Sequence, residues 1–467
     1  GQALNGAAPG DVAFNWANNG PNTPLYNINP GCGDGSVTLP SGFTPQPCTI
    51  VGVIPNLRTP YVSTWNLSVE HAITNNMSLE VAYIGNHGTK LVSLNDINQP
   101  PLGSGWTPAA KLACLNSASD PTPYDSCAPD PVAEQAARPF SKKFPYLNYI
   151  NLLANGDESN YNGLQMTLTQ RTSHGLSFTA GYTYAHALDN SSDNFGLLHI
   201  PVLNSDPRYA SSDFDIRHRF TLAATYELPG KSGFAQMLKG WSLNSVVTIQ
   251  TGTPWLVQDS ANDFTGTGEV LQPTGSELEQ WNFIGNPADF TMKHGFTEFN
   301  GGALTGGAGG VPYFGPITST TNPSCVAAAQ KLDGGAPTGL AQAALANAGC
   351  YALGNSILIP PAYGTYGTTG RNIFRDTGLK DWDFSITKAF IFKERLTAQF
   401  RAEFFNVLNH PTFANPYGGS GGGAASDDPS IGPGFGCGCV TADTGGSNPV
   451  LGAGGPRAMQ LGLKLIW

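Results

Sequence analysis

The sequence predicts an all-β fold, an antiparallel barrel whose strands cross a membrane, on three observations. The last stretch, residues 457–467, alternates apolar side chains with small or polar ones. Because successive side chains of a strand point to opposite faces, this stretch has one apolar face. Only 12% of the 467 residues are charged, whereas roughly a quarter are charged in typical soluble domains. The third observation is that short and long connections alternate along the chain.

The composition narrows the class of protein. The 58 glycines and 36 prolines predict extensive irregular connections. No apolar run approaches the ~20 residues of a membrane helix, so a membrane protein of this composition crosses with alternating strands, which a hydropathy average does not detect. The net charge of -10 argues against a nucleic-acid partner. A soluble secreted β-protein is the alternative that this composition leaves open.

Alternation predicts the strands in order along the chain. Residues 1–60 are rich in Gly, Pro and Asn and are expected to be a loop region, and residues 61–467 are expected to hold the strands. In the first hairpin, Leu67 and Val69 alternate with Ser68 and Glu70. The same pattern predicts four hairpins and a closing strand, at residues 61–86, 161–186, 215–251, 381–408 and 456–467.

The lengths of the connections predict an orientation. The connections at 74–76, 171–175, 228–240 and 392–394 are short, and those at 87–160, 187–214, 252–380 and 409–455 are long. Outer-membrane barrels have short periplasmic turns and long extracellular loops, whereas a soluble sandwich has no reason to sort its loops by side. We therefore expect the long connections and residues 1–60 to be extracellular. Short strands are possible within 252–380.

The closing strand is predicted to complete the sheet and to present its apolar side chains to lipid. Its candidate assembly residues are Leu461, Leu463, Leu465 and Trp467. Aromatic residues predicted to lie at the membrane interface are Tyr182, Tyr184, Trp241, Trp382 and Trp467. His218 falls on the apolar face, between two arginines, and is predicted to be interfacial rather than a ligand.

The strand count predicts that the chain is one part of a larger barrel. Alternation indicates about nine strands, and about nine to twelve if some are hidden, whereas single-chain bacterial barrels have an even number with both ends periplasmic. At least one strand is therefore expected upstream. The amino terminus has neither the basic region nor the apolar region of a signal peptide, as in a mature product or a fragment.

All eight cysteines lie in segments predicted to be extracellular. Their order suggests local pairs in an oxidising compartment, namely Cys32 with Cys48, Cys114 with Cys127, Cys325 with Cys350, and Cys437 with Cys439. The last pair would close a very short, strained ring. Two free thiols or a weak metal site are the alternatives there.

Charges on the polar face are expected to point into the barrel lumen and to pair across strands rather than to bind a solute. They are Glu70, Glu80, Arg217, Arg219, Glu227, Arg401 and Glu403. The acidic stretch 189–193 is predicted to be a solvated loop rather than a calcium site. No His-Glu-x-x-His motif occurs. We expect no catalytic residues, no cofactor and no metal, and therefore no enzyme.

Several strand segments resemble one family. Residues 63–70 (STWNLSVE), 79–85 (LEVAYIG), 160–165 (NYNGLQ), 178–184 (FTAGYTY), 215–220 (DIRHRF) and 401–411 (RAEFFNVLNHP) are similar to strands of TonB-dependent outer-membrane receptors of the Oar-like type, which carry an amino-terminal carboxypeptidase-regulatory-like domain. The resemblance implies a barrel of about 22 strands with a globular plug, an unknown extracellular ligand and energy supplied by the TonB complex.

The chain departs from this family because it shows no plug and no TonB box. The resemblance therefore implies that this chain is the carboxy-terminal barrel portion, in the bacterial outer membrane, with lipid, a missing plug and missing upstream strands as its partners. The alternative hypothesis is a surface structural or adhesion protein with disulfide-stapled loops.

Overall fold

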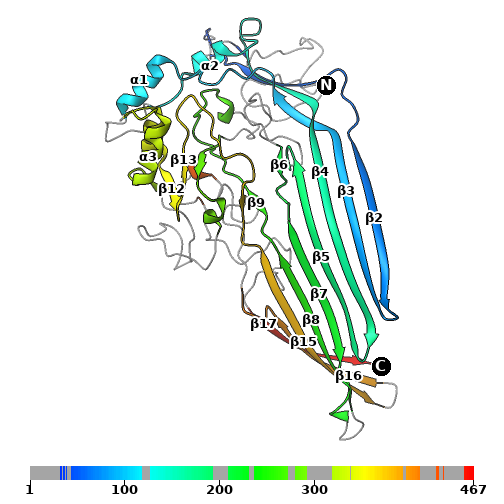
Figure 1. The fold of residues 1–467 in the computed structure, drawn as a ribbon. Helices are drawn as coiled ribbons and strands as arrows, with labels where there is room; N and C mark the ends of the chain where they lie inside the picture. The colour runs from blue at the N-terminus through cyan, green and yellow to red at the C-terminus, as the bar shows by residue number, and fades with distance from the viewer. Residues whose placement is uncertain are drawn as a thin grey trace, which may run out of the picture.

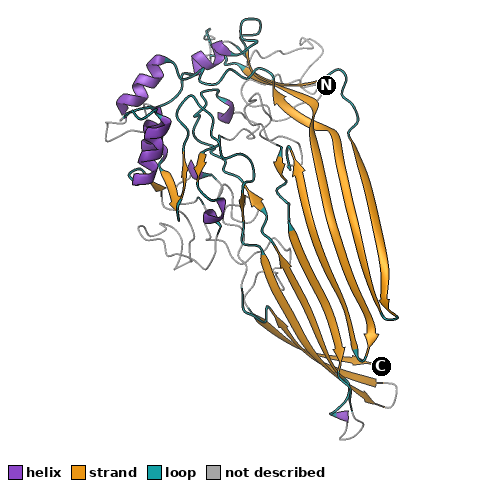
Figure 2. Cartoon of the chain, viewed as in Figure 1, coloured by secondary structure: helices purple, strands orange, loops and turns teal. Residues whose placement is uncertain are grey.

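The structure is a computed structural model. It describes residues 32–33, 35–36, 38, 44–117, 127–192, 209–230, 236–271, 279–291, 318–336, 338–392, 396–410, 428–430, 435 and 457–467. A large curved sheet of long strands carries, beside one end of its strands, a group of short helices and short strands (Figures 1 and 2).

Nine strands follow one another in the sheet in the order β17-β16-β15-β8-β7-β5-β4-β3-β2, and each neighbouring pair is antiparallel. Their bounds are β2 (Tyr61–Thr74), β3 (Met77–Asp96), β4 (Leu147–Ser173), β5 (Leu176–Asp189), β7 (His218–Glu227), β8 (Trp241–Gln250), β15 (Leu379–Phe392), β16 (Leu396–Phe405) and β17 (Ala458–Ile466). Within the described residues β2 and β17 are the two ends of this path, so the sheet is open.

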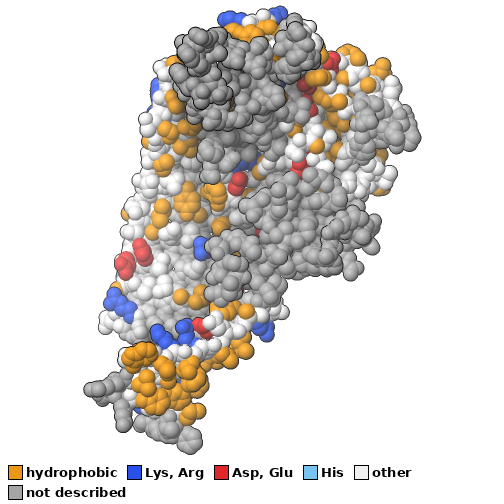
Figure 3. Space-filling model, turned by 180° about the vertical axis from the view of Figure 1, so that it is seen from behind, with side chains coloured by type: hydrophobic (Ala, Val, Ile, Leu, Met, Phe, Trp, Pro, Cys, Tyr) orange, Lys and Arg blue, Asp and Glu red, His pale blue; other side chains and the backbone are white. Residues whose placement is uncertain are grey.

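The register gives the sheet one polar face and one apolar face. Thr225, Asn244, Ser385, Glu403 and Gln460 form one row across β7, β8, β15, β16 and β17. The next row, Tyr226, Leu243, Ile386, Ala402 and Leu461, lies on the opposite face. Because side chains alternate along every strand, the whole sheet is two-sided. Hydrophobic side chains gather at the end of the molecule where β15–β17 lie, next to a band of charged side chains (Figure 3).

Two strands extend well beyond the ends that alternation predicts. β3 continues from the predicted end at residue 86 to Asp96, and β4 begins at Leu147 rather than at residue 161. The register shifts between Gly88 and Leu91 and again between Leu91 and Ser93, and Lys90 has a φ of 57°. A bulge inserts an extra residue and resets the alternation, so this part of the pair is not visible as a regular pattern. The prediction of an irregular segment over 87–160 is wrong at both of its ends.

The prediction that residues 1–60 are only loop is also wrong where the structure describes them. β1 (Cys48–Val53) is a strand that pairs in parallel with the extension of β4, from Leu147 to Leu153. Its apolar residues are consecutive, Ile50 and Val51, rather than alternating with polar ones, so a period of two does not reveal it. A second short strand, β6 (Ala210–Ser211), pairs with β5.

The long connections contain regular structure, so the all-β prediction holds for the sheet but not for them. The helices are α1 (Pro108–Ser117), α2 (Pro131–Ala137), α3 (Pro323–Leu332) and α4 (Leu340–Ala348), and the 3-10 helices are η4 (Glu269–Leu271) and η5 (Pro287–Phe290). The short strands are β9 (Pro254–Trp255), β10 (Asn282–Ile284), β11 (Thr318–Ser319), β12 (Cys350–Leu353), β13 (Ser356–Ile359) and β14 (Phe374–Arg375). No helix in the described part of the chain is long and apolar enough to cross a membrane.

We call the described residues of 97–146 and 251–378, together with 428–430 and 435, the loop module. Its core is a cluster with members from 97–146, from 251–378 and at 435, and the aromatic members are Trp106, Trp255, Phe264, Trp281, Phe290, Tyr351, Tyr363, Phe374 and Phe435. Trp255 stacks on Phe374, with ring centroids 4.4 Å apart. Burial of such rings removes large apolar areas from water. The connections therefore form one folded unit rather than separate loops.

Adjacent residues of β17 provide a test of the two faces. Leu461 lies in the apolar row, and Gln460 lies in the polar row. We expect Leu461→Arg to destabilise the folded protein in lipid by about 2–4 kcal/mol at mid-bilayer depth and by less near an interface. Gln460→Arg places the same charge on the opposite face and should cost less. Urea unfolding in lipid vesicles measures both, and equal losses of stability would contradict the assignment of faces.

Candidate functional site

Ion pairs of the buried Arg371 attach the loop module to the end of β5 and to the β5–β7 connection. Arg371, which is 2% exposed, donates to Asp189 at 2.6 Å and to Asp213 at 3.0 Å. The Asp189 side chain also accepts from Ser192 at 2.8 Å. The prediction of a solvated loop at 189–193 is therefore wrong for Asp189, whose cationic partner lies 182 residues away along the sequence. Residue 193 lies outside the described residues.

Asp215 is a second attachment point. Its carboxylate accepts hydrogen bonds from the Ala187 backbone N–H at 2.8 Å, from Arg217 at 2.7 Å and from Arg375. Burial alone would raise the pKa of Asp215, but these hydrogen bonds outweigh it and lower the pKa below its ordinary value. Arg217 lies just before the first residue of β7 and pairs with Asp215. The prediction that Arg217 points from a strand into the lumen is therefore wrong.

A third buried charge cluster lies beside α2. Arg138, which is 5% exposed, donates to Asp96 at 3.2 Å and to Glu269 at 3.3 Å. Its guanidinium carbon lies 4.4 Å from the ring centroid of Tyr149, a favourable cation–π contact. This arginine joins the end of β3, α2, β4 and η4, and both of its carboxylate partners are buried.

Glu134 of α2 belongs to the same cluster, but Arg138 forms its ion pairs with Asp96 and Glu269 and not with Glu134. It is 6% exposed, and its Oε1 meets no hydrogen-bond donor among the described residues. Burial, followed by the charge of the nearby Asp263, raises the pKa of Glu134 to about 8. Asp263 accepts hydrogen bonds from the backbone N–H groups of Gly266 and Gly268, at 2.7 and 2.8 Å. Burial and the negative charge of Asp263 therefore favour the protonated form of Glu134.

A cavity of about 670 Å³ lies against this cluster. We call it the α2 pocket; it is lined by Gln46, Pro47, Pro131, Val132, Glu134, Gln135, Ala136, Arg138, Ser141, Lys142, Pro145, Asn148, Tyr149 and Gly268. Apolar walls with a few convergent polar groups, one of them with a shifted pKa, are typical of small-molecule sites. Nothing in the sequence pattern around Glu134 predicted this pocket, because its walls come from separate segments.

The polar face of the sheet carries a second, smaller cavity, of about 440 Å³, whose lining includes Asn244, Ser385 and Arg401. The charges there do not pair across strands as predicted. Arg401 binds Glu403 of the same strand at 2.7 Å, because residues two apart share a face. Glu70 lies directly opposite Glu80, a like-charged pair.

The aromatic residues predicted to lie at the membrane interface make few polar contacts. The Tyr182 hydroxyl lies 2.8 Å from Nδ1 of His218, and the Tyr184 and His218 ring centroids are 5.1 Å apart. Trp241 and Trp382 donate from their indole N–H groups to the Met237 carbonyl and the Ser245 hydroxyl. Trp467 is 92% exposed. A ring with one bonded polar atom, as in Tyr182, Trp241 and Trp382, is compatible with the predicted place at a membrane interface.

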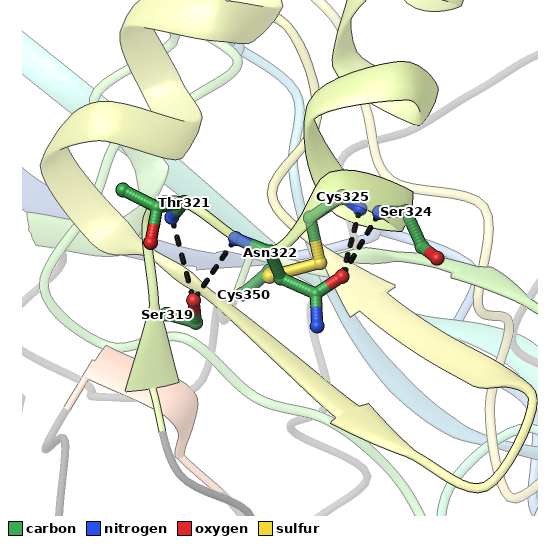
Figure 4. Close-up of a disulfide and its surroundings, with 6 residues drawn as sticks. All are labelled: Ser319, Thr321, Asn322, Ser324, Cys325 and Cys350. Atoms are coloured by element: carbon green, nitrogen blue, oxygen red, sulfur yellow. Dashed lines mark hydrogen bonds between the residues drawn. A yellow bond between two sulfur atoms is a disulfide. The ribbon is translucent and has the colours of Figure 1, made fainter.

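Three disulfides lie outside the nine-stranded path of long strands. They join Cys32 to Cys48, Cys114 to Cys127, and Cys325 to Cys350, with Cα atoms 5.3, 4.2 and 6.5 Å apart. The third links the first turn of α3 to β12, beside the Asn322 side chain that accepts from the Ser324 and Cys325 N–H groups (Figure 4). Cys437 and Cys439 lie outside the described residues. Among the described residues, no group of three His, Cys, Asp or Glu side chains is placed to hold a metal ion.

The family of the chain is shown by its sequence. A family model described as "Outer membrane beta barrel domain" matches residues 2–460. The chain belongs to this family, and the bacterial outer membrane is its location. The apolar face of the sheet is therefore the face that meets lipid. No curated protein matches the chain.

Several solved structures are similar in part. The outer membrane transporter YddB from Escherichia coli is 9% identical with a TM-score of 0.30, and the match covers 78% of this chain and 30% of that one. The FpvAI–pyocin S2 complex is 8% identical with a TM-score of 0.27, over 76% and 24% of the two chains. The ferripyoverdine receptor of the outer membrane of Pseudomonas aeruginosa, bound to ferripyoverdine, is 8% identical with a TM-score of 0.27, and the match covers 75% of this chain and 23% of that one. The chain thus spans less than a third of the length of these structures.

The raised carboxyl pKa values predict how the stability of the loop module depends on pH. The folded module holds the Glu134 proton up to about pH 8, whereas an ordinary Glu loses it near 4.5. The stabilisation is complete below about pH 4.5 and is lost as the pH rises to 8, by up to about 1.4 kcal/mol per pH unit. Burial raises the pKa of Asp259 to about 6 and also raises the pKa of Glu279. Both groups therefore also make the folded module less stable as the pH rises.

Thermal unfolding at pH 5, 6, 7 and 8, followed by near-UV circular dichroism of the core tryptophans, measures this dependence. Glu134→Gln should flatten the decline, because the amide does not titrate. Glu70→Gln, on the polar face of β2, is the matched control and should leave it unchanged. An unaltered decline in the Glu134→Gln variant would show that another group causes it.

Proposed function

We propose that this chain is part of an outer-membrane receptor, rather than an enzyme, and that the receptor binds an extracellular ligand for TonB-dependent uptake. In this proposal the sheet is a section of the barrel wall, and the loop module is the ligand-recognising part outside the cell. Membership of the outer-membrane barrel family supports the location. The resemblance of the strands to Oar-like TonB-dependent receptors supports the mechanism of uptake.

The observation that carries the proposal is the separation of the two kinds of connection. The loop module lies beside the upper ends of the strands, and the tight turns that join β2 to β3 and β4 to β5 lie at the lower ends (Figure 1). A folded unit with a pocket, an aromatic core and disulfides needs far more chain than strand pairing requires. A long, folded set of connections at one end of the strands is expected of a binding surface.

Transport itself needs parts that this chain does not show. The open path from β17 to β2 spans nine strands, fewer than a barrel that encloses a plug. We propose that a plug, further strands and the TonB complex complete the intact protein, in which the polar face with Asn244 and Arg401 lines the lumen.

A surface structural or adhesion protein is the second candidate. The disulfides at Cys114–Cys127 and Cys325–Cys350 favour it, because cross-links make exposed loops resistant to unfolding. Adhesion needs neither a plug nor an energy source, and this difference separates the two functions experimentally.

Labelling of intact cells tests the orientation. Val132 of α2 is 75% exposed, and Asn75 lies exposed in the β2–β3 turn. In the proposed orientation, a membrane-impermeant maleimide labels Val132→Cys on intact cells and labels Asn75→Cys only after lysis. Labelling of Asn75→Cys alone on intact cells would place the loop module in the periplasm and refute the proposal.

Growth tests the uptake function. Cells that produce the intact protein, with and without a functional TonB complex, are supplied with a siderophore, a glycan, a peptide or cobalamin as the limiting nutrient. We expect one of these to support growth only when both the protein and TonB are present. Attachment of cells to a surface that depends on the protein but not on TonB, with no nutrient effect, would favour adhesion instead.

A further inference from the structure

The α2 pocket carries an inference about the kind of ligand that the protein binds. We propose that this pocket takes an organic cation, a primary ammonium group carried on an apolar chain, with Glu134 as the group that receives the ammonium. The inference deepens the proposed function, because it rests on the loop module being the ligand-recognising part. Binding of the cation depends only on the pocket, so it can be tested separately from TonB-dependent uptake.

The buried charges around the pocket are unbalanced. Glu134 lines the pocket, and four more buried carboxyl groups belong to the network around Arg138 and Glu134, namely Asp96, Asp263, Glu269 and Glu279; each of the five is at most 9% exposed. Arg138 is the buried cation of this cluster, and its guanidinium is bound to Asp96 and Glu269. Buried carboxylates are stable only when paired with a cation, supplied with donors or protonated. A cation from outside would supply what Glu134 lacks.

The other charged groups that face Glu134 do not fill this role. Asp130, at the amino end of α2, is acidic and caps the helix by accepting from Val132 and Ala133. Asp263 is acidic, and its carboxylate accepts hydrogen bonds from backbone N–H groups of its own loop. Lys142 lines the pocket but is exposed, so water screens its charge. Glu134 is the lining carboxyl group without a donor on Oε1.

The donor set favours an organic cation over a metal ion. The described residues contain no group of three His, Cys, Asp or Glu side chains arranged as metal ligands, whereas calcium takes six to eight oxygens. An ammonium group needs only one or two acceptors and has N–H donors to offer. The walls beside Glu134 include Pro131, Val132 and Pro145, apolar surfaces that suit a hydrocarbon chain.

Binding exchanges a proton for the ligand. The ammonium group enters with its three protons, and Glu134 releases its own proton to water and becomes the carboxylate partner. No covalent bond forms or breaks apart from that proton transfer. Because Glu134 must ionise, affinity rises with pH up to the pKa of about 8, by about tenfold per pH unit well below it.

Isothermal titration calorimetry of the full chain in detergent, with butylammonium chloride as the probe, tests the proposal. Butan-1-ol and sodium butyrate are the neutral and anionic counterparts of the same chain length. At pH 8 we expect butylammonium to bind at least about tenfold more tightly than either. We also expect about a tenfold gain in affinity between pH 6 and pH 7.

Two variants locate the site. Glu134→Gln should weaken butylammonium binding by at least about tenfold and remove its pH dependence, and the amide is a neutral side chain of nearly the same size as the protonated acid. Glu70→Gln removes the same charge from β2 and should bind as the unmodified chain does. Equal affinity for butylammonium and butan-1-ol, or unchanged binding by Glu134→Gln, would overturn the proposal.

Calcium chloride provides the remaining arm. Binding of calcium that requires Glu134, with no binding of butylammonium, would make the pocket a metal site and contradict the inference. If the chain in detergent binds butylammonium as expected, but growth of the cells does not depend on TonB, the inference stands and the uptake function is refuted. Failure of the pocket and failure of the proposed function are therefore separate results.

Discussion

The need to pair every backbone N–H and C=O group determines this structure. In a bilayer no water can satisfy an unpaired peptide group, so strands cross only when each is bonded to its neighbours. The seven inner strands of the described path meet this need by antiparallel pairing on both sides, as β7 does with β5 and β8, whereas β2 and β17 each pair on one side. The alternation of side chains then follows from the backbone, and it gives the sheet an apolar side with Leu and aromatic residues and a polar side with Thr, Ser and Asn. The low content of charge is a consequence of the same arrangement.

Past the regular part of the sheet, the same strand pairing continues without the strict alternation of two faces. β3 and β4 extend past the regular part of the sheet, with bulges around Lys90 and with β1 added in parallel at the side of β4. Irregular registers are tolerated there because water or the loop module can satisfy the extra backbone groups. The loop module lies beside this extended end of the sheet (Figure 1), and the ion pairs of Arg371 and Arg375 hold it against the end of β5 and the β5–β7 connection.

The sequence predicts these two regions unequally. Each strand of the wall contains an alternating stretch, because lipid on one side and water on the other impose a period of two. The sequence pattern predicts no helices, although α2 and α3 begin at Asp130-Pro131 and Asn322-Pro323, where the Asp and Asn side chains cap the helices. Their short lengths left no helical periodicity to detect. The α2 pocket was not predictable, because Glu134 and Asp263 are brought together by tertiary packing and carry no motif that links them.

The shared aromatic core has a consequence for how such a surface can change. Trp106, Tyr351 and Phe435 belong to three different connections, yet they lie in one cluster, and Tyr351 and Phe435 have ring centroids 4.5 Å apart. A relative that acquired a different connection at one of these places would have to match the other two. New specificities are therefore expected to arise by small substitutions on the rim of the module or by exchange of the whole module, and not by replacing one loop at a time.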